Sequence, residues 1–388
     1  MRYPEFLKEN GRIGLIAPSF GCAQGQYRQR LERAISAFEE KGFETVCGPN
    51  AFAEEGIGIS NTPEKCAAEA NDFFLNDRSD VIISCGGGEL MCEILPYMDF
   101  EAIAKAKPKW FAGYSDNTNF TFLLNTLCDT AAIYGPNAGS FMRREDFEAY
   151  YSEAFALSGK NHGQIGEIAE VMFEMSQKSL NLLCGGSAEE TNCGGSAEET
   201  NCGRKLTVTN YGRWFEEFKT GVDEDAHADF AAHDYKHFLY EGSQPKEELD
   251  FSGRLTGGCL DVLANLVGTS FDKVAEYTKK YEEDGIIWFL ECCDLNVMSQ
   301  TRAYWSLENA GWFNNVKAFI IGRPYLFSDS FGDFDHYAAA LHSLSKYNVP
   351  IILDADLGHL SPMMPIISGA YAHVQADGKG MRIEHVLK

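Results

Sequence analysis

Ser115, Glu291 and His359 are the residues of this sequence best suited to acyl transfer, and each lies at or just after the end of a short apolar segment. A serine hydroxyl is a weak nucleophile until a base takes its proton. Histidine can serve as that base near neutral pH, and a carboxylate can orient the imidazole and stabilise its charged form. Because reactive groups gather at the C-terminal ends of strands in α/β proteins, these three residues could meet in space.

Each of the three also has a plain structural interpretation. Ser115 follows Gly113 and precedes a helical pattern, so it could cap that helix, and the Gly-x-Ser-x-Gly pattern of a nucleophile elbow is absent. Glu291 could be an exposed residue where a strand ends. His359 could be a hydrogen-bonded structural histidine. Local spacing alone leaves both interpretations open for each residue.

A glycine turn could supply the other requirement of acyl transfer. Gly86, Gly87 and Gly88 follow Cys85 and the apolar residues 81–84. Glycines let the backbone approach a ligand closely, and backbone N–H groups stabilise the negative charge that develops on an oxygen. A phosphate-binding or purely structural turn is the alternative, although no lysine follows, as a P-loop would require.

The segments that must position these residues alternate between strand and helix patterns. We predict strands at 12–17, 43–47, 81–84, 109–112, 285–291, 316–322 and 350–354, and helices at 26–41, 62–76 and 119–127. Strands that alternate with helices indicate right-handed βαβ units and a mostly parallel sheet. The predicted fold is therefore α/β, with an N-terminal mostly parallel sheet flanked by helices and a smaller C-terminal α/β domain.

The chain is expected to have three parts. Residues 1–150 form an N-terminal α/β domain that bears the serine, residues 151–250 form a linker with an insertion loop, and residues 251–388 carry the glutamate and the histidine. The pattern weakens in the middle part, where CGGSAEETN occurs twice in tandem between residues 184 and 201. Glycine, serine and short polar residues favour a loop there. Residues 255–267 combine glycine with helical spacing and open the third part.

The composition narrows the choice of partner and compartment. A net charge of −24, from 33 basic and 57 acidic residues, disfavours nucleic acid and anionic membrane surfaces as partners. The sequence has no apolar run of about 18 residues, which a membrane-spanning helix would need, and its start does not resemble a signal peptide. Twelve cysteines then indicate reduced thiols. We expect a cytoplasmic protein.

In order along the chain, these motifs resemble those of the LD-carboxypeptidase family of serine peptidases. The matching segments are GRIGLIAPS at 11–19, Gly86-Gly87 with ILPYMD at 94–99, GYSD at 113–116, LTGGCL at 255–260 with Gly268-Thr269, Glu291, and Gly358-His359. The resemblance covers most of the chain. It implies that Ser115 attacks a carbonyl carbon, His359 takes the serine proton and Glu291 orients His359.

The same resemblance implies further features of the site. The backbone N–H groups of Gly87 and Asp116 would form the oxyanion hole, and Gly86 and Gly88 would contact the substrate. No cofactor and no metal are expected, and family members are usually homodimers. The family name implies a hydrolase, a serine-type carboxypeptidase.

The glycine turn departs from the family members that act on murein peptides, which often carry Arg-Gly-Gly-Tyr-Gly there. This chain has Cys85-Gly86-Gly87-Gly88-Glu89, with neither arginine nor tyrosine. Together with the long middle region, this resembles the branch of microcin C self-immunity peptidases, which cleave an amide near an aminoacyl-nucleotide. The expected substrate is a peptidyl- or aminoacyl-nucleotide. The alternatives are a murein tetrapeptide that loses its terminal D-Ala, and a non-catalytic binding protein on the same fold.

Other side chains are candidates for substrate or metal binding. In the microcin branch an aromatic residue of a middle loop helps to hold the base, and Trp214 is the candidate here; an ordinary hydrophobic anchor is the alternative. Arg302 could bind a carboxylate or phosphate, as could Arg323, although either could instead form a structural ion pair. His233 and His237, near His227, would share a helix face and permit a metal site, but such a site needs a third ligand and a supporting shell.

Overall fold

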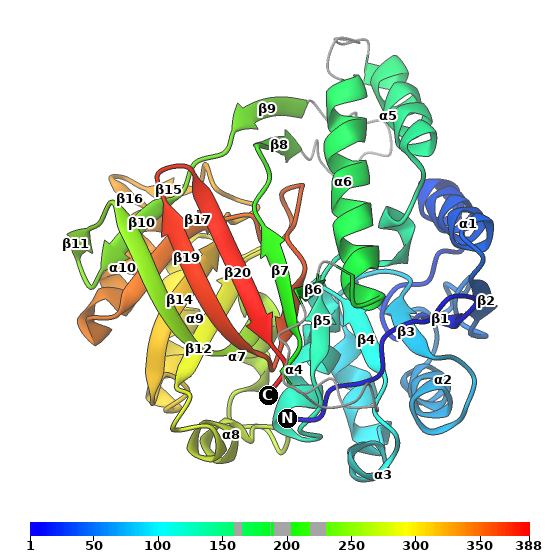
Figure 1. The fold of residues 1–388 in the computed structure, drawn as a ribbon, viewed down its shortest axis with the longest axis horizontal. Coiled ribbons are helices and arrows are strands. Elements are labelled where there is room, and N and C mark those ends of the chain that lie inside the picture. The colour runs from blue at the N-terminus through cyan, green and yellow to red at the C-terminus, as the bar shows by residue number, and fades with distance from the viewer. Residues whose placement is uncertain (159–164, 187, 190–202, 218–229) are drawn as a thin grey trace.

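The computed structural model describes residues 1–158, 165–186, 188–189, 203–217 and 230–388. These form two large sheets with their covering helices and two small two-stranded sheets (Figure 1). One sheet has six strands in the order β18-β5-β4-β3-β1-β2. These strands are β1 (Arg12–Ile16), β2 (Glu44–Cys47), β3 (Val81–Ser84), β4 (Trp110–Gly113), β5 (Ala132–Tyr134) and β18 (Ile366–Ser368). All neighbours pair in parallel except β18, which is antiparallel to β5.

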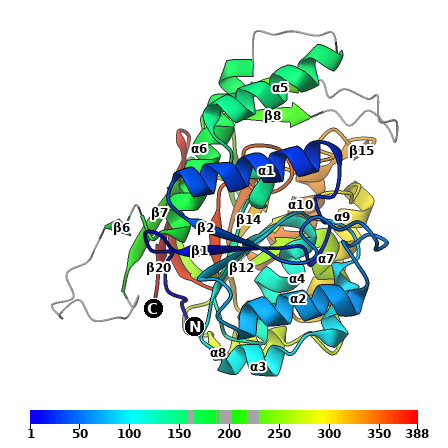
Figure 2. The ribbon, with the colours of Figure 1, turned by 90° about the vertical axis from the view of Figure 1, so that its right-hand side faces the viewer.

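Helices cover both faces of the six-stranded sheet. Figure 2 shows α1 (Gly25–Glu40) on one face and α2 (Pro63–Leu75) and α3 (Phe100–Lys105) on the other. A further helix, α4 (Thr118–Thr126), follows β4. Every residue of β3 and β4 is buried, as expected for parallel strands covered on both faces. The predicted elements, which are β1 to β4, α1, α2 and α4, lie within one or two residues of their expected bounds at each end, whereas α3, β5 and β18 were not predicted.

The second sheet has ten strands in the order β11-β10-β17-β14-β13-β12-β19-β20-β7-β6. Its strands are β6 (Ala188–Glu189), β7 (Lys205–Thr209), β10 (Phe238–Glu241), β11 (Gln244–Pro245), β12 (Glu248–Cys259), β13 (Ile286–Glu291), β14 (Val316–Gly322), β17 (Pro350–Ala355), β19 (Tyr371–Asp377) and β20 (Gly380–Val386). Strands β12, β13, β14 and β17 pair in parallel. The associated helices are α7 (Leu260–Leu266), α8 (Val274–Lys280), α9 (Val297–Asn309) and α10 (His336–Leu344). The predicted α/β fold class is confirmed.

The middle region contains more regular structure than the sequence suggested. Helices α5 (Arg144–Ser158) and α6 (Ile165–Leu183) lie in it, as does the hairpin of β8 (Arg213–Glu217) and β9 (Phe230–Asp234). In residues 255–267, helical spacing was expected after the glycines, and α7 begins there, at Leu260. The glycines themselves belong to β12, which pairs with β13 on one side and β19 on the other. Most of the duplicated CGGSAEETN segment, and His227, lie outside the described residues.

The two sheets meet where α4 packs against β12. The backbone N–H of Cys259 donates to Thr118 Oγ1 at 3.0 Å. A β-carbon at Gly258, whose φ is +143°, would fall 2.6 Å from the Thr118 methyl carbon, so only glycine permits this approach. The contact brings the end of β4 close to the end of β13, although these strands belong to different sheets.

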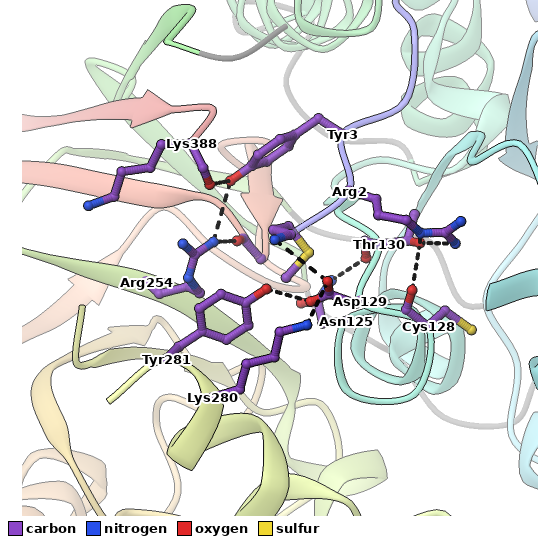
Figure 3. A network of polar contacts seen from close by, with 12 residues as sticks. Arg2, Tyr3, Asn125, Cys128, Asp129, Thr130, Arg254, Lys280, Tyr281 and Lys388 are labelled. Carbon is purple, nitrogen blue, oxygen red and sulfur yellow. Dashed lines mark hydrogen bonds and ion pairs between the residues drawn. The ribbon is translucent and has the colours of Figure 1, made fainter. Parts of the chain in front are cut away.

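A polar network near the two chain ends also links the parts of the chain that carry the two large sheets (Figure 3). Asp129, which follows α4, forms ion pairs with the N-terminal amine at 3.6 Å and with Lys280 of α8 at 2.8 Å. The Tyr3 hydroxyl donates to the Lys388 carbonyl at 3.1 Å and lies 3.4 Å from Arg254 Nη1, which donates to it.

None of the helices in the described part of the chain is long and apolar enough to cross a membrane.

Candidate active site

Ser115, Glu291 and His359 meet at the junction of the two sheets. Ser115 opens a single 3-10 turn (Ser115–Asn117) after β4, Glu291 ends β13, and His359 follows β17. His359 Nε2 lies 2.8 Å from Ser115 Oγ, and His359 Nδ1 lies 2.8 Å from Glu291 Oε2. The structure therefore brings together the three residues that the sequence singled out, at hydrogen-bond distances suited to a nucleophile, its base and an orienting carboxylate.

The backbone of Ser115 is in the left-handed region, with φ at +64°. A non-glycine residue seldom adopts this conformation, and it costs free energy that the surroundings must supply. Here it turns the chain sharply from β4 into α4 and aims the hydroxyl at His359. Asn117, and not Ser115, is the N-cap residue of α4. The helix-cap interpretation of Ser115 is therefore wrong.

Glu291 is 1% exposed and has a hydrogen-bond partner on each carboxylate oxygen. Oε2 faces His359, and Oε1 accepts a hydrogen bond of 2.5 Å from the Tyr134 hydroxyl. Two glycines leave room for it, since a β-carbon at Gly322 or Gly358 would fall 2.9 Å from Glu291 Cβ. Glu291 is thus a buried carboxylate with partners, not an exposed residue at a strand exit.

The charges of the buried pair support each other. Burial raises the pKa of Glu291, but His359 and the hydrogen bonds from Tyr134 and Cys259 together outweigh it, and the net pKa is below the usual value. Burial lowers the pKa of His359, but the Glu291 carboxylate and the Cys293 thiol together outweigh this effect, and the net pKa is well above the usual value. The pair therefore favours a carboxylate that stabilises an imidazolium.

The glycine turn runs beside the serine. A β-carbon at Gly87 would lie 3.2 Å from Ser115 Cβ and 3.3 Å from Ser115 Oγ. Gly86 anchors the turn, because its carbonyl accepts hydrogen bonds from Asn117 Nδ2 at 2.8 Å and from Ser84 Oγ at 2.9 Å. A β-carbon at Gly88 would overlap Ser19 Oγ at 2.1 Å, so Gly88 packs on the loop after β1.

The side chain of Asp116 lies on the buried side of the turn. Its Oδ2 accepts hydrogen bonds from Ser19 Oγ at 2.5 Å and from the Met91 N–H at 2.9 Å. Burial raises the pKa of Asp116 to about 6. This carboxyl group joins the loop after β1, the start of the segment at Met91 and the serine turn into one unit.

Trp214 and Arg302 lie among partners other than the three central residues. The Trp214 ring in β8 stacks on His233 with centroids 4.2 Å apart and lies 4.3 Å from the Arg323 guanidinium. Arg323 pairs with the buried Asp356 at 3.4 Å, in the loop that leads to His359. Arg302 is exposed on α9, where it donates to Ser299 Oγ at 2.8 Å.

The histidines of the middle region do not share a helix face. His233 lies in strand β9 and contacts Glu216 at 3.1 Å, while His237 lies beyond the strand and contacts the Tyr235 hydroxyl at 2.7 Å. The expectation of a helix there is wrong, because the segment pairs with β8 instead. Within the described residues, no group of three or more histidine, cysteine or acidic side chains could hold a metal ion.

Tyr134 is a residue of the site that sequence reasoning missed. It is fully buried at the end of β5 and touches both Glu291 and Ser115. The only sequence signal was a polar hydroxyl at the C-terminal end of a short apolar strand.

Comparison with known proteins identifies the architecture. Residues 13–135 match the family model of the LD-carboxypeptidase N-terminal domain, and residues 252–374 match that of the LD-carboxypeptidase C-terminal domain. A candidate carboxypeptidase of Vibrio cholerae is 24% identical over 384 residues, which cover 99% of this chain and 98% of that protein.

The chain is also similar to the microcin C7 self-immunity protein, both in sequence and in structure. The microcin C7 self-immunity protein of Escherichia coli is 23% identical over 356 residues, which cover 92% of this chain and 88% of that protein. A solved structure of the microcin C7 self-immunity protein in complex with aspartyl sulfamoyl adenosine superposes with a TM-score of 0.71 at 19% identity, and the match covers 100% of this chain and 99% of the other.

Proposed function

Because this chain belongs to the LD-carboxypeptidase family, we propose that it is a serine-type carboxypeptidase or amidase with Ser115 as nucleophile, His359 as base and Glu291 as the carboxylate that orients His359. The observation that carries this proposal is the unbroken chain of hydrogen bonds from Ser115 Oγ through the imidazole to Glu291, with 2.8 Å at each step. The neutral imidazole donates from Nδ1 to Glu291 and accepts at Nε2 from the serine hydroxyl.

In the proposed mechanism, Ser115 Oγ attacks the carbonyl carbon of an amide while its proton passes to His359 Nε2. The oxygen of the tetrahedral intermediate carries the negative charge, and the backbone N–H groups of Gly87 and Asp116 stabilise it. Collapse breaks the C–N bond, and His359 gives its proton to the leaving amine. A water molecule then cleaves the acyl-enzyme by the same steps and restores the free serine.

We propose a peptidyl- or aminoacyl-nucleotide as the substrate. The missing arginine and tyrosine of the glycine turn argue for it, and so does the aspartyl sulfamoyl adenosine bound to the microcin C7 self-immunity protein. Gly86 and Gly88 would border the scissile amide. Arg302, which is exposed, would meet the phosphate.

Trp214 would hold the base of the nucleotide. Its side chain is 9% exposed, with Arg323 over the ring and His233 stacked on it. Stacking on a base would therefore require one of these contacts to open. The ordinary packing role of Trp214 competes with the binding role, and a Trp214→Phe variant assayed for substrate KM separates them.

The substrate test compares two compounds on the purified protein, a murein tetrapeptide that ends in D-Ala and an aminoacyl-sulfamoyl adenosine. Mass spectrometry follows the release of D-Ala or of the nucleoside part. We expect the nucleotide conjugate to be cleaved and Ser115→Ala to abolish the cleavage. Cleavage of the tetrapeptide alone would favour the murein alternative. Hydrolysis that survives in Ser115→Ala would contradict the catalytic assignment and leave the binding-protein alternative.

The remaining sequence predictions concern assembly and location. A homodimer and a cytoplasmic location stay predictions, and the first is checked by light scattering on the purified chain. Every cysteine within the described residues is unpaired, in keeping with the expectation of reduced thiols.

A further inference from the structure

We propose that Tyr134 is a positioning residue of this site, because its hydroxyl group holds the Glu291 carboxylate and the backbone of Ser115 at the same time. The inference rests on the proposed roles of Ser115, His359 and Glu291. It adds a residue that neither the family match nor the sequence pattern brought forward.

The hydroxyl of Tyr134 completes a closed ring of hydrogen bonds. It donates to Glu291 Oε1 at 2.5 Å and accepts from the Ser115 N–H at 3.3 Å. His359 joins the other side of the ring, with 2.8 Å to Ser115 Oγ and 2.8 Å to Glu291 Oε2. The nucleophile and the carboxylate are thus linked twice, once through the imidazole and once through the phenol.

The fold holds the Tyr134 ring from both sheets. Tyr134 ends β5 and stands opposite Gly113 in β4, two residues before Ser115. Its ring packs on Phe289 of β13, with centroids 5.4 Å apart, two residues before Glu291. Since the side chain is fully buried, the hydroxyl has little freedom to leave either partner.

The protonation state fits a donor to a carboxylate. Burial raises the pKa of Tyr134 well above its usual value, and the nearby Glu291 adds to the shift. The phenol therefore keeps its proton throughout the working pH range. A neutral donor on Oε1 leaves Oε2 as the oxygen that faces His359, much as an outer partner fixes the orientation of a ligand to a metal.

The second bond of Tyr134 concerns the strained turn. The Ser115 N–H points at the tyrosine oxygen, which helps to retain the φ of +64° that aims Oγ at the imidazole. Loss of the Tyr134 hydroxyl would thus displace Ser115 as well as Glu291. It would lower kcat more than it would change KM.

The Tyr134 hydroxyl also reduces the effective negative charge of the Glu291 carboxylate. A hydrogen bond to a carboxylate stabilises its anionic form and lowers its affinity for a proton. Without the phenol, Glu291 would attract the imidazolium of His359 more strongly. The pKa of His359 would then rise, and the acidic limb of the rate profile would move to higher pH. A residue that only fills space would not move this limb.

The experiment is Tyr134→Phe, which keeps the ring and removes only the hydroxyl. We expect kcat to fall by about tenfold to a hundredfold, with KM within about twofold, because an orienting contact is lost and not a substrate contact. We also expect the acidic limb of kcat/KM to move up by roughly half to one pH unit. An unchanged limb, or a kcat within about twofold of wild type, would overturn the proposal.

Two controls and one double variant isolate the effect. Tyr277→Phe removes a hydroxyl from another buried tyrosine, in α8, whose ring packs on Tyr281, and it should leave the limb in place. The double variant Glu291→Gln/Tyr134→Phe should have the same acidic limb of kcat/KM as Glu291→Gln alone, because the carboxylate charge is already gone. Full activity of Ser115→Ala would refute the proposed function itself. An inactive Ser115→Ala beside a wild-type-like Tyr134→Phe would refute only the role of Tyr134.

Discussion

Gly358 lies directly against the carboxylate of Glu291: a β-carbon at position 358 would fall 2.5 Å from Glu291 Oε2. The φ of Gly358 is +99°, which residues with a side chain seldom adopt. The residue before His359 therefore has to be glycine for two separate reasons, space and conformation. Both act on the same hydrogen bond, between Glu291 and His359.

Gly358→Ala should therefore inactivate the enzyme without unfolding it. The new methyl group would push Glu291 or the His359 loop out of place, and a displacement of about 1 Å can cost on the order of a hundredfold in rate. Gly332→Ala is the matched control, because Gly332 has a φ of +65° but a β-carbon added there would meet nothing within 4 Å. Equal kcat values for the two variants would contradict the steric argument.

The rate should depend on pH through His359. The imidazole must be neutral to accept the serine proton, and its pKa is raised well above 6.5 by Glu291 and Cys293 despite burial. Activity is therefore lost as pH falls through this raised pKa, so the acidic limb of kcat/KM should lie above pH 6.5. Glu291→Gln should move the limb to lower pH while it lowers kcat. A wild-type limb at or below pH 6.5 would contradict the coupling of the pair.

Gly87→Ala should slow catalysis by crowding the nucleophile. The methyl carbon would stand 3.2 Å from Ser115 Cβ and 3.3 Å from Oγ, closer than such contacts usually come. Either the serine or the proposed oxyanion donor must then move by a few tenths of an ångström. We expect kcat to fall about tenfold or more. Gly378→Ala, with open space around the new carbon, serves as the control and should keep the wild-type kcat.

His385 should make the stability of the protein fall in acid. Its Nδ1 donates to the Leu206 carbonyl at 3.2 Å, and its Nε2 accepts from the Ile367 N–H at 3.2 Å, so the neutral ring joins β7 to β18. Burial lowers the pKa of His385 to about 4, against an ordinary 6.5. The unfolded chain binds the proton first as pH falls. This contribution to stability is therefore complete above pH 6.5 and is lost progressively towards pH 4.

The size of that loss is about 3 kcal/mol for this one group. Denaturant unfolding of wild type and His385→Gln between these two pH values measures it, since the variant lacks the titrating ring. His373→Gln is the control, because His373 is a surface residue paired with Asp250. The same pH dependence in wild type and His385→Gln would show that other groups cause the acid sensitivity.

Much of the architecture was predictable because its elements carry strong local signals. Strand β13 is an uninterrupted apolar run that ends on a carboxylate, and the sequence indicated both the strand and Glu291 as a candidate. In the middle region, β7 is defined by pairing with β20, which lies far along the chain, whereas α6 has buried residues at helical spacing that the sequence prediction missed. Tyr134 carried only a weak sequence signal, a hydroxyl at the end of a short apolar strand, because its role depends on two sheets meeting at one hydroxyl.

The division of the three proposed catalytic residues between two sheets has one more consequence. Ser115 comes from the six-stranded sheet, whereas Glu291 and His359 come from the ten-stranded one. The catalytic rate therefore depends on the contact between the two large sheets. A mild denaturant that loosens the contact of α4 with β12 would abolish activity. At the same denaturant concentration, circular dichroism would still report intact helices and strands. A rate assay could thus detect separation of α4 from β12 that circular dichroism does not detect.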